Sequence, residues 1–312
     1  MNHIRRFTLA CSAIALLSGS AALGQSDPAI EDAIVQQGQI ADILRGQQQS
    51  AGQETDETEI DGEAGVYVLR VNGIFFIGAN GGIGYSENPA RIANNSGGSG
   101  FASAGVSAGV QTRINGAVDV GLRADLLGVE YFESNAPSSR SVAGSLAVGT
   151  NLGKSPLYAS ANFFGGFNFD RSFDDGVSFY GAGLSLGAGL LLGKRTLLRP
   201  GIGVTRQWSG ISENNSTSAT ASLSLTHLAT GSLTIGADLQ VSRVWFDDFY
   251  EDVTAVPRND WQYSAGLDAN YAFTRWLSLN ASAGYEKRDS SFFLSAYDGF
   301  ETSLVLSARR RF

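Results

Sequence analysis

The stretch "WQYSAGLDANYAF", residues 261–273, alternates two kinds of side chain along its whole length. Apolar residues, several of them bulky, occupy the odd positions from Trp261 to Phe273, and mostly small or polar residues occupy the even positions between them. Successive side chains of a β-strand point to opposite sides of the sheet, so this alternation predicts a strand with two unlike faces. The fold then depends on which of the two faces meets water.

The same alternation recurs from about Val66 onward and predicts twelve strands. Short connections such as "NG" (115–116) alternate with long polar ones such as "ENPARIANNSGGS" (87–99). Sequential hairpins whose short turns all fall at one end predict an up-and-down antiparallel meander. In the third strand the alternation shifts near Leu127 and Gly128, which predicts a β-bulge. The predicted strands cover 66–86, 100–114, 117–132, 141–152, 157–169, 178–192, 196–208, 217–228, 232–246, 261–273, 276–288 and 300–312.

The apolar face of these strands either fills a soluble core or faces lipid. The strands are longer than the five or six residues usual in globular sheets and suit tilted membrane-spanning strands. Aromatic residues also gather at strand ends on the apolar face, as they do at lipid headgroup levels. The sequence therefore predicts an all-β fold, a 12-stranded antiparallel up-and-down transmembrane β-barrel. The predicted membrane-interface aromatics are Tyr85, Phe169, Tyr180, Trp208, Trp245, Trp261, Tyr263 and Tyr285 at the long-loop end, and Tyr271, Phe273 and Phe312 at the short-turn end.

The N-terminal region differs in composition from the rest of the chain. In residues 1–24, two arginines precede an apolar run, and Ala22 and Gly24 supply the small residues that a signal peptidase requires. We therefore expect a secretory signal peptide, whose removal takes with it Cys11, the only cysteine. A chain without cysteine has neither disulfides nor thiolate metal sites.

Residues 25–64 are predicted to form a periplasmic extension ahead of a barrel that covers 65–312. Isoleucines and a leucine follow one stripe up to about Arg45, which predicts a short amphipathic helix. The acidic, polar stretch that follows predicts a disordered linker. This extension either plugs the barrel, binds a periplasmic partner or serves as a tether.

Two short stretches resemble known proteins. The glycine-rich "NGGIGYSENPARI" (80–92) resembles the first strand of proteobacterial β-barrel porins, some of which are linked with export of surface polymers. The strand "SLVLSARRRF" (303–312), with its final Phe312, resembles the closing strand that the outer-membrane assembly machinery of Gram-negative bacteria recognises. The resemblance implies a place in the outer membrane of a Gram-negative bacterium, with lipid, lipopolysaccharide and that machinery as partners.

Charged residues on the small-residue face are expected to line the barrel interior. They support two interpretations, a charged constriction that selects solutes and a ladder of cross-strand salt bridges in a wet lumen. The sequence does not separate these alternatives. The predicted pore-lining residues are Arg113, Asp119, Arg123, Asp125, Arg199, Asp238, Asp268, Glu286, Glu301 and Arg309.

The sequence offers little for catalysis or for metal binding. After signal cleavage the only histidine is His227, on the outward face near a short turn, and serines without a base are weak nucleophiles. We expect neither an enzyme nor a cofactor, and the net charge of −8 argues against nucleic acid. The leading hypothesis is a porin-like passive channel for small polar solutes. The alternatives are a non-conducting structural or export-accessory barrel and, last, an outer-membrane hydrolase.

Overall fold

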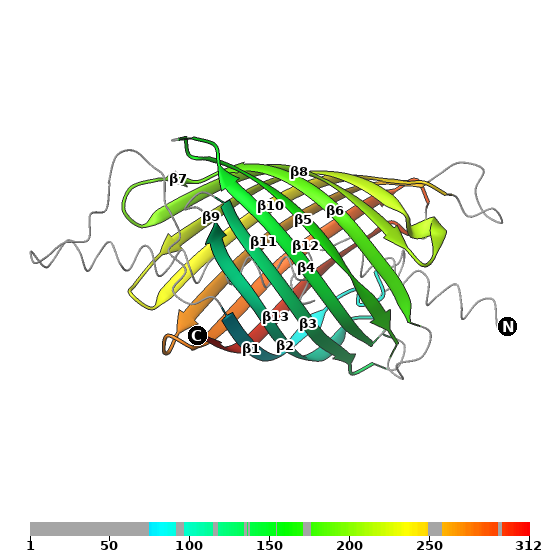
Figure 1. The fold of residues 1–312 in the computed structure, drawn as a ribbon. Helices are drawn as coiled ribbons and strands as arrows, with labels where there is room; N and C mark the ends of the chain where they lie inside the picture. The colour runs from blue at the N-terminus through cyan, green and yellow to red at the C-terminus, as the bar shows by residue number, and fades with distance from the viewer. Residues whose placement is uncertain are drawn as a thin grey trace, which may run out of the picture.

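The chain folds into one closed barrel of antiparallel strands (Figure 1). The predicted signal peptide, helix and linker, and the predicted start of the first strand at 66–74, lie outside the residues that the structure describes. The computed structural model describes residues 75–91, 97–114, 118–133, 136, 138–153, 155–170, 176–248, 258–292 and 295–312.

The strands agree closely with the sequence predictions. A short 3-10 helix, η1 (Ser212–Asn214), lies between two of them. The strands are β1 (Phe75–Ser86), β2 (Ser99–Ile114), β3 (Val118–Tyr131), β4 (Ser139–Asn151), β5 (Leu157–Phe169), β6 (Val177–Ala188), β7 (Leu190–Leu191), β8 (Thr196–Ser209), β9 (Ser216–Leu228), β10 (Leu233–Phe246), β11 (Asn259–Ala272), β12 (Leu277–Ser290) and β13 (Tyr297–Arg311).

The barrel has twelve strands because β6 and β7 are two parts of one strand. Both pair with β8, and the register that joins Gly187 to Gly201 continues to Leu190 and Leu198. The same register sets Pro200 of β8 opposite the break, and proline has no N–H to donate to a ladder. The predicted twelve-stranded up-and-down topology is confirmed.

Pairing between the first and last strands closes the barrel. The register of β1 with β13 runs from Phe76 opposite Arg311 to Ser86 opposite Glu301. Beyond it, the Phe312 N–H donates a hydrogen bond to the Phe75 carbonyl (2.9 Å). Among the described strands, closure leaves no sheet edge with unpaired backbone groups, which is the condition for placing strands in lipid.

The apolar face of the strands is the outer face. Trp261 is 43 % exposed and Leu184 is 69 % exposed, whereas Gln262, the next residue after Trp261, is only 8 % exposed. Polar residues of low exposure alternate with exposed apolar residues in the same way along β10 and β12. Among the described residues, no helix is long and apolar enough to cross a bilayer.

The predicted bulge in β3 is wrong. Residues of β3 pair one to one with β2 from Tyr131 to Val118, and one to one with β4 from Val129 to Val118. The alternation of facing therefore continues, and Leu127, Val129 and Tyr131 stay on the inner face, where the last two are buried with Phe101. Apolar residues are stable on the inner face here because other residues at the long-loop end cover them.

Two substitutions at neighbouring positions of β6 test the assignment of the faces. Leu184→Arg places a charge on the outer face midway along the strand, and we expect a loss of about 2–4 kcal/mol in the free energy of unfolding in lipid. Ser185→Arg adds the same side chain to the inner, water-accessible face and is expected to change stability far less. Urea unfolding in phospholipid vesicles, followed by tryptophan fluorescence, measures both. The opposite ranking would indicate a soluble core.

Candidate functional site

The predicted pore-lining residues lie at several levels of the barrel interior. Midway along β3, Arg123 Nε donates to Asp125 Oδ1 at 2.8 Å, and Arg123 is buried. Toward the short turns, Arg199, Asp238 and Asp268 come from β8, β10 and β11, and Ser224 Oγ donates to Asp238 Oδ1 (3.1 Å). The remaining predicted residues lie at the two ends of the barrel.

At the short-turn end, Arg309 lies over the ring of Phe76, with 3.8 Å from its guanidinium carbon to the ring centroid. Arg113 and Asp119 sit directly opposite each other in the register of β2 with β3. At the long-loop end, Glu286 and Glu301 are buried within a larger group of charges. The charges thus form separate local groups along the interior rather than one ring at a single level.

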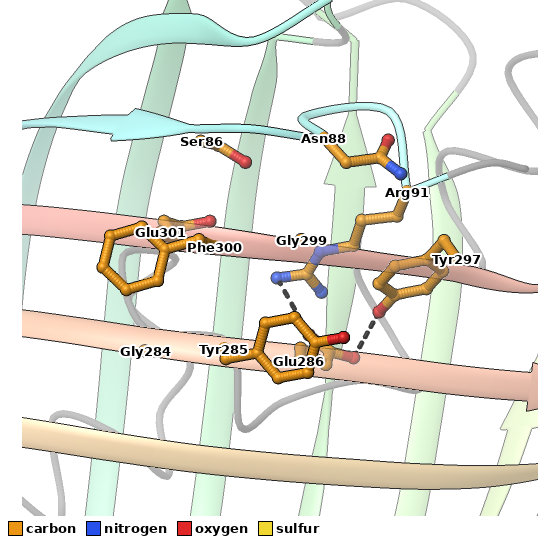
Figure 2. A pocket seen from close by; sticks show the side chains of 10 residues that line it. All are labelled: Ser86, Asn88, Arg91, Gly284, Tyr285, Glu286, Tyr297, Gly299, Phe300 and Glu301. Atoms are coloured by element: carbon orange, nitrogen blue, oxygen red, sulfur yellow. Dashed lines mark hydrogen bonds and ion pairs between the residues drawn. The ribbon is translucent and has the colours of Figure 1, made fainter. Parts of the chain in front are cut away.

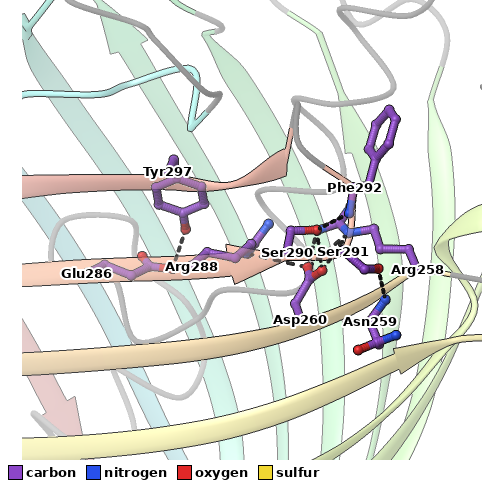
Figure 3. A network of polar contacts seen from close by, with 9 residues as sticks. All are labelled: Arg258, Asn259, Asp260, Glu286, Arg288, Ser290, Ser291, Phe292 and Tyr297. Carbon is purple, nitrogen blue, oxygen red and sulfur yellow. Dashed lines mark hydrogen bonds and ion pairs between the residues drawn. The ribbon is translucent and has the colours of Figure 1, made fainter.

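Asp260 is the centre of the first buried charge group at the long-loop end (Figure 3). Its carboxylate is fully buried, and its two oxygens share the N–H of Arg258 Nε at 2.9 Å each. Arg258 Nη2 donates a further hydrogen bond to Oδ2, and Ser290 Oγ donates one of 2.5 Å to Oδ1. Arg288 Nε lies 3.8 Å away from Asp260 Oδ2. Arg258 also lies over the ring of Phe246 at 4.4 Å, which ties the end of the β10–β11 loop to the inner wall.

Glu286 belongs to the second buried charge group (Figure 2). The hydroxyl of Tyr297 donates a hydrogen bond to its Oε1, and Arg91 Nη2 lies 3.7 Å from its Oε2. Arg91 comes from the β1–β2 loop and reaches across β13 between Tyr297 and Glu301. Burial lowers the pKa of Arg91, but the charges of Glu286 and Glu301 more than compensate and keep it above its usual value. Arg91 therefore stays positively charged at any physiological pH.

A small pocket lies beside Arg91. Ser86, Asn88, Glu286 and Glu301 are among its lining residues, and its cavity volume is about 20 Å³. That is room for one or two water molecules and too little for a solute. The pocket is therefore a packing defect around the buried Arg91 side chain rather than a substrate site.

Sequence reasoning missed Arg91, Arg258, Asp260 and Arg288 as interior residues. The strands β11 and β12 extend two residues further toward the long loops than predicted, which adds Asp260 and Ser290 to their inner faces. The alternation itself could have found Asp260 and Arg288, since both are even-numbered like Gln262 and Glu286. Arg91 gave no such signal, because only a long-range contact places a loop residue inside the barrel.

The long-loop end of the interior is packed, whereas the middle is open. Phe101 packs edge-on against Tyr131, with ring centroids 5.5 Å apart, and Val244 and Phe246 form a second buried cluster. Midway along the strands the inner face consists mainly of Gly, Ser, Thr and Asn. Exposed side chains on that inner face are Ala147, Asn162, Ser185 and Ser222.

Large side chains on the inner wall lie over glycines of the neighbouring strand. A Cβ built on Gly181 would be 2.4 Å from Cζ of Phe164, and Gly181 is the direct partner of Phe164 in the register of β5 with β6. The same arrangement joins Phe76 with Gly109. Glycine thus lets each ring lie flat along the wall, which keeps the space inside the barrel open.

The predicted interface aromatics lie on the outer face. Tyr180 stacks on Trp208 (5.3 Å between centroids), and Trp261 stacks on Tyr263 (6.3 Å). Phe132, an exposed aromatic just beyond β3, is one of those that sequence reasoning did not include. The predicted interface aromatics that are at least 39 % exposed are Tyr85, Tyr180, Trp245, Trp261, Tyr263, Tyr271, Phe273, Tyr285 and Phe312.

Catalytic and metal chemistry find little support in these residues. His227 is exposed on the outer face near the short turns, and its Nδ1 lies 2.9 Å from Thr196 Oγ1. Within the described ranges, no three His, Cys, Asp or Glu side chains are grouped closely enough to hold a metal ion. Residues 249–257, between β10 and β11, lie outside the described residues.

The closed barrel, its apolar exterior and its aromatic ends define an integral outer-membrane β-barrel protein of the Gram-negative type. No protein-family model matches the sequence, and no curated protein matches it.

Some solved structures resemble this chain. An outer-membrane channel from Pseudomonas putida has a TM-score of 0.54 at 10 % identity, over 82 % of this chain and 100 % of that one. The outer-membrane channel DcaP of Acinetobacter baumannii has a TM-score of 0.42 at 12 % identity, and the match covers 76 % of this chain and 96 % of that one. LpxR from Salmonella typhimurium has a TM-score of 0.43 at 11 % identity, and the match covers 73 % of this chain and 99 % of that one.

Removing Arg91 tests whether it holds the β1–β2 loop inside the barrel. Arg91→Ala leaves Glu286 and Glu301 buried without its guanidinium, and loss of one partner from a buried ion pair costs about 3–5 kcal/mol. We expect faster hydrogen exchange of the amides of residues 87–91 in detergent or nanodiscs. Lys287→Ala, which removes an exposed ion pair with Asp289 (3.0 Å) on the outer face, is the control and should leave that exchange unchanged. Equal exchange in both variants would show that Arg91 does not hold the loop.

Proposed function

We propose that this barrel is a passive, porin-like channel for small polar solutes. The observation that carries the proposal is the open middle of the interior, where the inner face has small polar side chains and Asn162, Ser185 and Ser222 are exposed. Small barrels are filled by their own side chains, whereas wide ones enclose water, and twelve strands are intermediate. Side-chain size on the inner face therefore decides between a filled and an open barrel.

The charges also suit a hydrated interior. Arg123 and Asp125, and likewise Arg258 and Asp260, form hydrogen-bonded pairs on the inner face. Pairing lets such charges sit in the barrel wall without projecting into the space between the strands. The fold shared with the Pseudomonas putida outer-membrane channel is compatible with conduction.

The packed long-loop end predicts a narrow outer mouth. Arg91 and Arg258 fix parts of two loops to the inner wall, and Phe101 and Tyr131 are buried at the same end. At the short-turn end, Leu228 is fully buried on the inner face. We therefore expect a small conductance that is limited at the ends of the barrel rather than in its middle.

Planar bilayers test the channel directly. The mature chain and a second form that lacks residues 25–64 are each inserted, and we expect stepwise ion conductance from at least the shortened form. If only the shortened form conducts, the extension is a plug. If both bilayers stay silent while the protein is folded and inserted, the channel proposal is wrong and a non-conducting structural or export-accessory barrel takes its place.

A second experiment narrows the middle of the barrel. Gly183→Trp adds a large side chain to the inner face of β6, where the neighbouring side-chain atoms belong to Asn162 and Thr205. We expect the single-channel conductance to fall by roughly half or more, because pore diameter limits ion flow. Leu184→Trp, one residue along and facing lipid, is the matched control with unchanged conductance. Equal conductance in the two variants would place the ion path elsewhere.

A further inference from the structure

The interior of the barrel has two unlike walls. The charge groups around Asp260 and Glu286 lie on β11, β12 and β13. On the described strands β4, β5 and β6, by contrast, no inner-face position carries a charged residue. The next strand around the barrel, β8, carries Arg199 on its inner face and so ends this neutral stretch. The part of the interior formed by β4, β5 and β6 is therefore neutral and rich in hydroxyl and amide groups.

Aromatic rings lie among the polar groups of this neutral wall. Tyr158 and Phe164 face the interior from β5, and Phe179 faces it from β6, with 6.4 Å between the centroids of Phe164 and Phe179. Tyr158 is 38 % exposed, and the other two rings are half-buried. Six residues separate Tyr158 from Phe164, about 20 Å along a strand. The rings thus mark a path along the barrel axis.

The rings of Phe164 and Tyr158 lie over glycines of β6. A Cβ on Gly181 would be 2.4 Å from the Phe164 ring, and a Cβ on Gly187 would be 2.7 Å from the Tyr158 ring. Each ring covers the space that a side chain would occupy, so one of its faces turns toward the interior. An aromatic face carries negative potential and attracts the partly positive hydrogens of C–H groups.

Amide and hydroxyl groups surround these faces. Asn162 is exposed between Tyr158 and Phe164 on β5, and Ser160 and Ser185 form a hydrogen-bonded pair at 2.6 Å beside it. Such groups both donate and accept hydrogen bonds without bearing charge. A ligand that fits this wall has a rigid face of C–H groups together with several hydroxyls and no charge.

We propose that the wall formed by β4, β5 and β6 is a binding surface for small neutral sugars, with the rings of Tyr158, Phe164 and Phe179 stacking on the sugar rings. The inference rests on the proposed channel and names the class of its solute. A cyclic sugar has a C–H face for the aromatic rings and hydroxyls for Asn162 and Ser185. The charged wall on β11, β12 and β13 contributes no comparable surface.

The test compares glucose with sorbitol, its open-chain reduction product. The two solutes have nearly equal mass and similar hydroxyl content, but sorbitol lacks the rigid C–H face. Ion conductance in planar bilayers first establishes that the channel is open. The reduction of the ion current by each solute then measures binding, and swelling of proteoliposomes measures entry. We expect glucose to reduce the current at lower concentration, and to enter faster, than sorbitol.

Variants at two neighbouring positions of β5 show which residue causes the preference for glucose. Phe164→Ala removes an inner ring. It should raise the glucose concentration that is needed to reduce the ion current about three- to tenfold, which corresponds to the loss of one aromatic contact. Phe163→Ala removes the adjacent ring, which faces outward and is 54 % exposed, and should leave that concentration unchanged. Phe164→Leu keeps most of the volume, so it remains informative if the alanine variant folds poorly, and it should also lose the preference for glucose.

The outcomes separate the inference from the channel proposal. A preference for glucose that Phe164→Ala or Phe164→Leu abolishes and Phe163→Ala retains supports the sugar surface. Normal ion conductance with equal effects of glucose and sorbitol, or a preference untouched by either Phe164 variant, overturns it and leaves the channel intact. Absence of both conductance and solute entry overturns the channel proposal, and the sugar surface with it.

Discussion

The whole structure depends on the hydrogen bonding of the backbone in a solvent that offers none. In hydrocarbon, every N–H and C=O group must find its partner within the protein, so a sheet can span the membrane only if its edges join. The pairing of β1 with β13 meets this condition. The closed barrel then has twelve strands, with β6 and β7 counted as one. Once the sheet is closed, one face of every strand must meet lipid, and the alternation of residues then determines the interior.

The interior follows from what the inner face contains. Because bulky apolar residues are turned outward, small residues such as Gly183 and Ser185 remain inside the middle of the barrel. Glycines opposite Phe164 and Phe76 let those rings lie against the wall. At the long-loop end, by contrast, Arg91 and Arg258 reach inward from loops and pack the space. The interior is therefore open in its middle and packed at the long-loop end, and Leu228 is fully buried at the short-turn end.

The strands and their faces could be predicted from the sequence, because alternation depends only on neighbouring residues and on the two-sided environment. The contacts inside the barrel could not. Arg91 and Glu286 form an ion pair although they are almost two hundred positions apart in the sequence, and the residues next to Arg91 do not predict that contact. The predicted bulge in β3 failed for a related reason. The rule that apolar residues face lipid does not hold for Val129 and Tyr131, which other residues cover at the long-loop end.

The outward direction of the apolar residues is the central claim, and single cysteines on β6 test it most directly. In a background with Cys11→Ser, which removes the only native cysteine, Leu184→Cys and Ser185→Cys are compared in vesicles. A fluorophore at position 184 should be quenched by brominated lipid, and a thiol at 185 should react with a small water-soluble reagent. Lipid quenching at 185 together with aqueous reaction at 184 would contradict the account.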